Sequence, residues 1–436
     1  MMYRIFSVLA LSVLSATMYA QTITLDEAIA QGLRNRPELK TREVQIRIAE
    51  GENDKLRAQW LPQLNASADL RWNTELQTSV LPVGQFGLPG VAADATQEIQ
   101  IGVPFNNALS VQAEQKIYDA NRRIDRQINA AQVESQQAAL SQESRDIRFA
   151  ITEAYYAAVF NREKMDLARQ ALDRAQLNLR VAQNQLQAGA VLPNDVDRLA
   201  LDLSNAQLSL KKAEQDYSLS VKRLQYQIGT SPDGGIQLSE SISALLTDTL
   251  ALINRIEQRP EILSENIALR LNALNRDKQL ARRLPTVSAY GNYTLLQLSE
   301  TFNPVASGTW FPYSFIGVKA TVPIFDGRQA RLGAREFALR QEINRYNLDR
   351  LRAGFNFDAT AQASAMQQAR QDVEESRKNV QLARQLLATD QLRFEQGVLK
   401  QTDLKNSEFA LQTAENNYLN AVYAFLVARL NFEKSL

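Results

Sequence analysis

Apolar residues recur at alternating steps of three and four residues on both sides of Gly189. Before this glycine the repeating positions are Ala168, Leu172, Ala175, Leu179, Ala182 and Leu186. After it they are Leu203, Ala206, Leu210, Ala213, Tyr217, Val221, Leu224 and Ile228. Heptad spacing is typical of helices that coil about each other, and alanines at the seam permit close approach. The pattern predicts two long antiparallel helices joined by a tip. A solvated helical rod or an ordinary bundle is the competing interpretation.

A second long helical stretch turns in the same way at Gly397. Each of the two glycines can take a positive φ and end a helix, and a short apolar loop follows it. Asp195 and Asp403 each stand six residues after their glycine, near the start of the next helix. The positions after the second tip that step by three and four are Leu404, Ser407, Leu411, Ala414, Tyr418, Ala421, Phe425, Ala428 and Phe432. The chain is therefore expected to contain two matching coiled-coil hairpins.

Alternating polar and apolar residues predict four β-strands, two in each half of the chain. The first follows Leu61-Pro62, and the others cover residues 111–117, 287–295 and 316–324. Between the first two strands, residues 77–107 are rich in Gly and Pro and predict a long loop. Strands of this length with one apolar side suit a barrel that spans a membrane.

The second half of the chain repeats the first. Arg36-Pro37-Glu38 recurs as Arg259-Pro260-Glu261 at an offset of 223 residues (259 minus 36), and Gly189 recurs as Gly397 at 208 (397 minus 189). Each repeat is expected to hold helices, two strands and one coiled-coil hairpin. The predicted organisation is a signal peptide at 1–20, a first repeat at 21–235, a polar connector at 236–249 and a second repeat at 250–436.

The N-terminal segment has the layout of a secretory signal, with Arg4 before an apolar run and small residues up to Ala20. We expect export and cleavage after Ala20. A retained membrane anchor is the alternative, but the apolar run is shorter than the roughly 20 residues needed to cross a bilayer.

Composition argues against an enzyme and against a nucleic-acid partner. The chain has no Cys and no His, and Lys+Arg number 49 against 48 Asp+Glu. Thiol nucleophiles, thiolate metal sites and the most common general base are therefore absent, and no overall charge attracts polyanions. The sequence also contains no phosphate-binding Gly-rich motif and no zinc-ligand pattern. We expect no catalytic residue, no cofactor and no metal.

Four strands cannot close a barrel of useful width, because about eight are needed even for a barrel filled by side chains. Unpaired strand edges are not tolerated in lipid. Further copies of the chain must therefore complete the strands, which predicts a cyclic homo-oligomer in contact with membrane lipid. Aromatic residues near the strand ends suit the two membrane interfaces, although each can also be a simple packing residue. These candidates are Trp60, Trp72, Trp310 and Tyr313.

The layout resembles the TolC-like outer-membrane efflux proteins over essentially the whole mature chain. The resemblance rests on the duplicated Arg-Pro-Glu, Leu61-Pro62 and Leu284-Pro285 before the strands, Val322-Pro-Ile-Phe-Asp-Gly327 after the last strand, and the two Gly-x5-Asp tips. It implies a mainly α fold in which long antiparallel coiled-coil helices form an α-helical barrel. It also implies a homotrimer in which four strands per chain build one 12-stranded membrane β-barrel.

The same resemblance implies a passive duct of a tripartite efflux or type I secretion system. The tunnel would extend from the outer membrane into the periplasm and receive substrates from an inner-membrane pump through a periplasmic adaptor, a membrane fusion protein. The cargo and the class of pump are not implied.

Two tip residues are candidates for a gate at the periplasmic entrance. By resemblance, Asp403 matches the family's aspartate that narrows this entrance, and Asp195 is its counterpart in the first repeat. Copies of one carboxylate around a symmetry axis form an acidic ring that selects cations. The alternative is that each Asp only stabilises a helix start. Some family members have a second acidic ring one turn further on, but this chain has Arg198 and Asn406 there.

The tips also carry candidates for contact with the adaptor, because exposed apolar residues usually mark an interaction site. The candidates are Gly189, Val191, Leu192, Gly397, Val398 and Leu399. Packing of the hairpin end is the alternative role. At the level of the whole protein, the alternative is a non-conducting coiled-coil structural or adhesive protein of the envelope. The paired alternating strands with aromatic ends argue against it.

Overall fold

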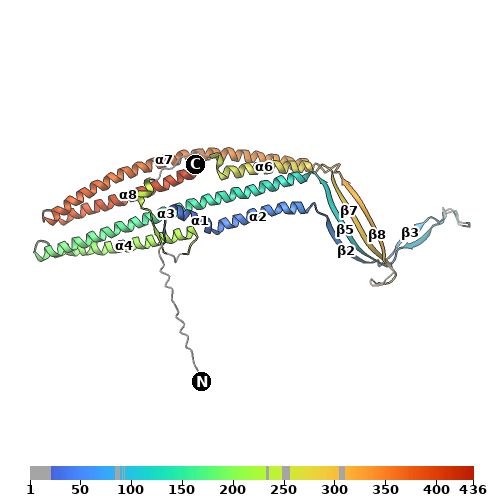
Figure 1. Ribbon diagram of the computed structural model, residues 1–436, viewed down its shortest axis with the longest axis horizontal. Helices are drawn as coiled ribbons and strands as arrows, with labels where there is room; N and C mark the ends of the chain where they lie inside the picture. The colour runs from blue at the N-terminus through green and yellow to red at the C-terminus, as the bar shows by residue number, and fades with distance from the viewer. Residues whose placement is uncertain are drawn as a thin grey trace, which may run out of the picture. The chain divides into compact units, whose positions relative to one another are not determined.

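The computed structural model describes residues 21–83, 89, 90, 92, 94–231, 235–247, 256–303 and 310–436 (Figure 1). The expected signal peptide lies outside these residues. The first half contains β1 (Gln21–Ile23), α1 (Leu25–Asn35), α2 (Pro37–Ala58), β2 (Gln63–Trp72), β3 (Gln77–Leu81), β4 (Gln97–Ile101), β5 (Phe105–Asp119), α3 (Asn121–Gln187) and α4 (Pro193–Ile228). The second contains β6 (Ile236–Leu238), α5 (Ile242–Thr247), the 3-10 helix η2 (Ile256–Gln258), α6 (Pro260–Ala281), β7 (Thr286–Ser299), β8 (Trp310–Thr321), α7 (Gln329–Glu395) and α8 (Gln401–Ser435).

The chain divides into two compact units, and each unit draws on both predicted repeats. The hairpin unit comprises the described residues of 1–45, 137–265 and 346–436. The sheet unit comprises those of 46–136 and 266–345. The predicted boundaries at 235 and 250 therefore refer to a duplication in the sequence, not to the compact units, because α3 and α7 each contribute to both units.

The hairpin unit confirms the two predicted antiparallel helix pairs. The seam positions of α4 from Leu203 to Ile228 are all buried or half-buried, while their neighbours on the helix are mostly exposed. A larger hydrophobic core forms where the hairpins meet α1 and the connector; it includes Tyr155, Leu224 and Leu426, each at most 1 % exposed. A smaller cluster near the second tip contains Ala383, Leu387, Phe394, Leu404 and Leu411.

The segment predicted as a polar connector contains regular secondary structure and contributes to the hydrophobic core. Within it, β6 pairs in parallel with β1, and α5 follows. Leu238 and Leu245 lie in the main core, at 7 % and 6 % exposure. The Arg162 side chain on α3 donates to the carbonyls of Leu238 and Glu240, at 2.7 and 2.5 Å. The connector therefore helps to hold α3 in place.

The sheet unit confirms the four predicted strands, which form one antiparallel sheet in the order β2-β5-β7-β8. The register places Ala66, Val111 and Tyr293 on one face, where most of the apolar residues lie. Ser67, Ser110 and Thr294 share the other, more polar face. The pairing register between β5 and β7 shifts at Ile117, between Lys116 and Tyr118. The sequence pattern had placed Ile117 in regular alternation with its neighbours.

The segment predicted as a long loop between the first two strands contains two strands of its own. β3 and β4 pair antiparallel, with Gln77 opposite Ile101 and Leu81 opposite Gln97. β5 also begins at Phe105, earlier than the predicted end of the loop at 107. The many glycines and prolines hid these short strands, because only about five residues on each side alternate.

In the part of the chain that the structure describes, every helix is too short or too polar to cross a membrane.

Candidate functional site

Both hairpin tips end their first helix with the same hydrogen-bonded turn. Gly189 and Gly397 have φ values of 74° and 73°. The N–H of Ala190 donates to the carbonyl of Gln185 at 2.8 Å, and the N–H of Val398 donates to that of Arg393 at 2.9 Å. This is the glycine-dependent helix ending that the sequence predicted, in which the last carbonyls are satisfied within the turn.

The two candidate gate carboxylates differ in exposure and in hydrogen bonding, although both occupy the third position of their helix. Asp195 is half-buried, and its Oδ2 accepts a hydrogen bond from the backbone N–H of Leu192 at 3.3 Å. That contact stabilises the start of α4, as the alternative interpretation of this residue required. Asp403 is exposed, and within the described ranges its carboxylate makes no hydrogen bond or ion pair. Only Asp403 therefore presents a free charge.

The apolar tip residues also divide into two kinds. Leu192 and Val398 are 69 % and 76 % exposed. Leu399 is half-buried against the hydrophobic cluster near the second tip, and Val191 is half-buried as well. Leu399 thus packs inside the second hairpin end, while the side chains of Leu192 and Val398 remain accessible to a partner.

A groove with a volume of about 490 Å³ separates the two tips of one chain. Its lining includes Gly189, Leu192 and Asp195 from the first tip and Gly397, Leu399 and Lys400 from the second. Across it, the Gln401 side-chain amide donates to the backbone carbonyl of Asp195 at 3.3 Å. The structure therefore brings most of the predicted tip residues together in one place, with Asp403 outside the groove lining.

Polar contacts join the first hairpin to α8 beyond the tips, and the sequence patterns did not predict them. The Lys405 ammonium lies 2.8 and 2.7 Å from the two carboxylate oxygens of Asp202 on α4. The Asn178 side chain on α3 donates to Oε1 of Glu408 at 2.5 Å. Both contacts join residues more than 200 positions apart, so no local spacing reveals them. Asn178 stands on a stretch of helix that also carries Arg174, Gln176 and Arg180, so its polarity was no signal either.

Burial of Glu408 raises the pKa of its carboxyl above the ordinary value of 4.5. The hydrogen bond from Asn178 and the charges of Arg174 and Lys405 lower it, and Asp202 raises it further, but the effect of burial prevails. The folded protein therefore holds this proton more tightly than the unfolded chain does. Stability contributed by the neutral form is lost as the pH rises from the ordinary glutamate pKa through the raised pKa.

We expect Glu408→Gln to raise the melting temperature at neutral pH and to have little effect below pH 4.5. The amide oxygen can still accept from Asn178 and carries no charge to bury. Thermal unfolding followed by circular dichroism at several pH values measures the difference, with Glu214→Gln at an exposed position of α4 as the control. A benefit that is the same at all pH values would contradict this account.

The candidate interface aromatics lie on different faces of the sheet unit. Trp72 stacks beside Phe105, with ring centroids 6.3 Å apart, and the register places Trp310 on the same apolar face. Tyr313 pairs with Thr294 and so belongs to the polar face. Trp60 precedes β2 at the other end of the strands, and the Arg122 guanidinium lies 4.1 Å from its ring centroid. The faces of Trp72 and Trp310 suit a membrane interface better than that of Tyr313.

Comparison with known proteins gives one family and several related proteins. Residues 28–230 match the model of the family described as outer membrane efflux protein. The chain is 23 % identical to the alkaline protease secretion protein AprF of Pseudomonas aeruginosa over 68 % of this chain and 64 % of AprF. It is 19 % identical to SilC of Salmonella typhimurium, a probable outer membrane lipoprotein, over 94 % of this chain and 84 % of SilC. The alignment with AprF thus spans less than two thirds of that protein.

Among solved structures, the chain resembles the open state of the Neisseria gonorrhoeae MtrE outer membrane channel. The TM-score is 0.70 at 16 % identity, over 94 % of this chain and 88 % of the other. At this identity the likeness establishes the fold: long helical hairpins with a small antiparallel sheet.

Proposed function

We propose that the chain belongs to the outer membrane efflux protein family, whose model matches residues 28–230, and that it forms an outer-membrane channel of an efflux or secretion system. The channel is a passive duct. It receives its substrates from an inner-membrane pump through a periplasmic adaptor, and the pump supplies the energy. The secretion role in the name of AprF supports the broader class but does not identify the cargo.

The observation that carries this proposal is a four-stranded sheet with one apolar face and two free edges. Within the described residues, β2 and β8 form the two edges and have no further strand beside them. Leu70 and Trp72 on β2 and Ile316 and Val318 on β8 are at least 57 % exposed in one chain. Lipid would cover such a face, but it would not tolerate free edges. Three copies would join these edges into a closed 12-stranded barrel.

The polar face of the sheet would then line the duct. It carries Asn65 and Ser67 on β2 and a hydrogen bond between the hydroxyls of Ser110 and Thr294, at 3.0 Å. Alternation of lipid-facing and lumen-facing residues is characteristic of strands in such barrels. A duct lined in this way can pass polar substrates without offering a catalytic site.

The hairpin tips would form the periplasmic mouth of the tunnel. Three copies of Asp403 around the axis would make an acidic ring, and its carboxylate makes no competing contact in the described chain. Asp195 contributes less, because its carboxylate already binds the start of α4. Leu192 and Val398 would meet the adaptor, which explains why two apolar side chains remain exposed at a helix turn.

Single-channel recording in planar bilayers tests both the duct and the gate. The wild-type protein should run as a trimer in detergent and form cation-selective pores with a low closed-state conductance. Asp403→Ala should raise this conductance several-fold and weaken cation selectivity, because an acidic ring both narrows the entrance and holds cations. Asp197→Ala, at a nearby exposed carboxylate, serves as the control.

Each negative result has a separate meaning. Trimers that never conduct would favour a structural envelope protein over a duct. Pores whose conductance and selectivity do not respond to Asp403→Ala would leave the duct in place and remove Asp403 from the gate.

A further inference from the structure

The duplicated Arg-Pro-Glu motif builds the same contact twice. In the second repeat, the Arg259 guanidinium donates to the carbonyl of Ser435 at 2.8 Å and to Oε1 of Glu261 at 3.2 Å. In the first, the Arg36 guanidinium donates to the carbonyl of Tyr226 at 3.3 Å and lies 2.9 Å from Oε1 of Glu38. Each arginine thus holds the last turn of a hairpin's returning helix, α8 or α4. We call Arg36, Glu38 and the Tyr226 carbonyl the first clamp, and Arg259, Glu261 and the Ser435 carbonyl the second clamp.

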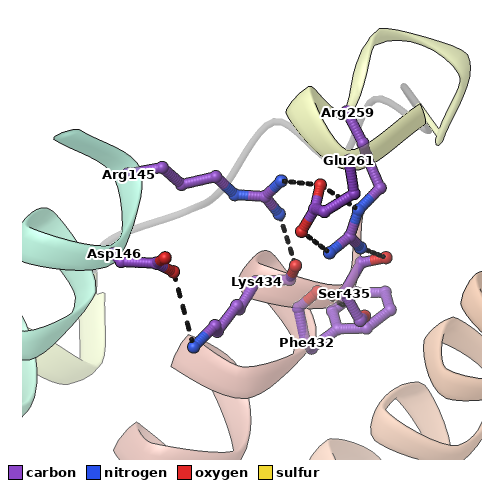
Figure 2. A network of polar contacts seen from close by, with 7 residues as sticks. All are labelled: Arg145, Asp146, Arg259, Glu261, Phe432, Lys434 and Ser435. Atoms are coloured by element: carbon purple, nitrogen blue, oxygen red, sulfur yellow. Dashed lines mark hydrogen bonds and ion pairs between the residues drawn. The ribbon is translucent and has the colours of Figure 1, made fainter. Parts of the chain in front are cut away.

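The second clamp has an additional arginine from the other repeat (Figure 2). Arg145 on α3 lies 3.8 Å from Oε2 of Glu261, and it donates to the carbonyl of Lys434. Lys434 in turn lies 3.9 Å from Asp146, also on α3. Burial would raise the pKa of Glu261, but Arg259 and Arg145 together hold it below its ordinary value. Both carboxylate oxygens of Glu261 therefore face a cation.

In the part of the chain that the structure describes, no additional arginine reaches the first clamp. Oε2 of Glu38 and Nε of Arg36 have no hydrogen-bond partner among the described residues, and both atoms are covered, although 43 % of the Glu38 side chain as a whole is exposed. A buried polar atom without a partner costs about 1–3 kcal/mol, so such atoms normally mark a missing neighbour. The second clamp shows what that neighbour is: an arginine from the long helix of an adjacent repeat.

The arrangement of helices shows where an adjacent repeat is missing. In the sheet unit, Asn129 on α3 donates to the carbonyl of Ala49 on α2, and Lys278 on α6 lies 2.6 Å from Asp125 on α3. Asn272 on α6 donates to Asn344 on α7 at 2.7 Å. The order is therefore α2-α3-α6-α7, which Figure 1 also shows. α2 leads into the edge strand β2, and α7 follows the edge strand β8. Each outer helix is therefore continuous in the chain with one of the two edge strands.

Apolar side chains on the two outer helices are exposed, and one of them has a repeat equivalent that is buried. Ile267 on α6 is 6 % exposed, whereas Val44, its equivalent at the offset of 223 (267 minus 44), is 42 % exposed. Ile48 on α2 is 61 % exposed, and Ile343 on α7 is 58 % exposed. α6 has α3 beside it, but among the described residues α2 has no helix in the equivalent place.

We propose that α7 of a second copy of this chain packs against α2 and that its Arg352 completes the first clamp. Arg352 is the equivalent of Arg145 at the offset of 207 (352 minus 145) that also relates Asp119 to Asp326 (326 minus 119). Within its own chain it binds both carboxylate oxygens of Glu257, at 2.9 and 3.0 Å, and the two side chains are 41 % and 64 % exposed, so Arg352 would have to leave Glu257 to complete the clamp. The contact is head-to-tail, and repeated around an axis it closes a ring.

This inference rests on the proposed assembly and adds a specific contact to it. Because the chain has no Cys, pairs of cysteines can be introduced and linked with a short bis-maleimide. Glu38→Cys with Arg352→Cys should give products of two and three chains on a denaturing gel. The matched control, Glu261→Cys with Arg145→Cys, should link within one chain and stay at monomer size.

A second pair avoids the clamp in case its substitution prevents folding. Ile48 and Ile343 lie on the exposed sides of α2 and α7. The Ile48→Cys and Ile343→Cys pair should therefore also form a cross-link between copies. Native mass spectrometry of the same samples measures the assembly itself. Trimers without either cross-link between copies would overturn the proposed contact and leave the trimer in place. Protein that stays monomeric would overturn both.

Discussion

A glutamate in place of Leu192 or Val398 is expected to abolish export while leaving the trimer intact. Both side chains are more than two-thirds exposed at the hairpin tips, so the free protein loses no packing when they change. If the adaptor covers them, the new charge must be buried without a partner, which costs several kcal/mol. At about 1.4 kcal/mol per factor of ten, the loss of adaptor binding should exceed tenfold. Export assays and cross-linking to the adaptor measure it.

The control for this experiment adds the same charge to a polar position of the same tip. Gln396 lies directly before Gly397 and is exposed, so Gln396→Glu should leave export near the wild-type level. Normal export by the Leu192→Glu and Val398→Glu variants would exclude these residues from the adaptor contact. It would leave the groove between the tips as the remaining contact surface.

Replacement of Arg429 by alanine is expected to lower the free energy of unfolding of the hairpin unit by about 3 kcal/mol. Arg429 on α8 is 6 % exposed, and it donates to the carbonyl of Leu245 on α5 and to the hydroxyl of Tyr156 on α3, both at 2.9 Å. Its loss would remove both of these hydrogen bonds from the protein interior and would open a cavity. Denaturant unfolding of the detergent-solubilised protein measures the change.

Lys434→Ala is the matched control, because it removes a cation from the same helix at a 52 % exposed site. We expect a change below about 1 kcal/mol there, as for most exposed ion pairs. Equal effects of the two variants would show that the buried arginine does not hold the connector to the hairpins.

Local features of the fold were largely predictable, because neighbouring residues determine them. The capping box at the start of α1 is formed as its Thr-x-x-Glu spacing predicts, with Thr24 and Glu27 bonded reciprocally at 2.9 and 3.2 Å. The two helix endings at Gly189 and Gly397 and the four main strands also agree with the pattern. The β3–β4 pair was missed, because five residues are too few to distinguish alternation from a loop.

The sequence placed the candidate tip residues together but did not distinguish their individual environments. Asp195 and Asp403 share a motif and a spacing, yet only the structure shows that Asp195 binds the N–H of Leu192 while Asp403 stays free. Likewise, Leu399 and Val398 are neighbours of similar polarity, and their exposure depends on which of them faces the cluster around Phe394. Burial depends on residues far along the chain, which a local pattern does not contain.

The sequence by itself determined the helix pairs, their tips, the strand faces and the duplication, because each depends on periodicity or on one glycine. Only the tertiary structure decided the order α2-α3-α6-α7, the contacts of Glu408 and Lys405 with the first hairpin, and the difference between the two clamps. These features join residues that are far apart in the sequence, and many compatible pairings exist for each side chain. Packing selects one pairing, and it leaves Glu38 of the first clamp without the additional arginine that Glu261 has.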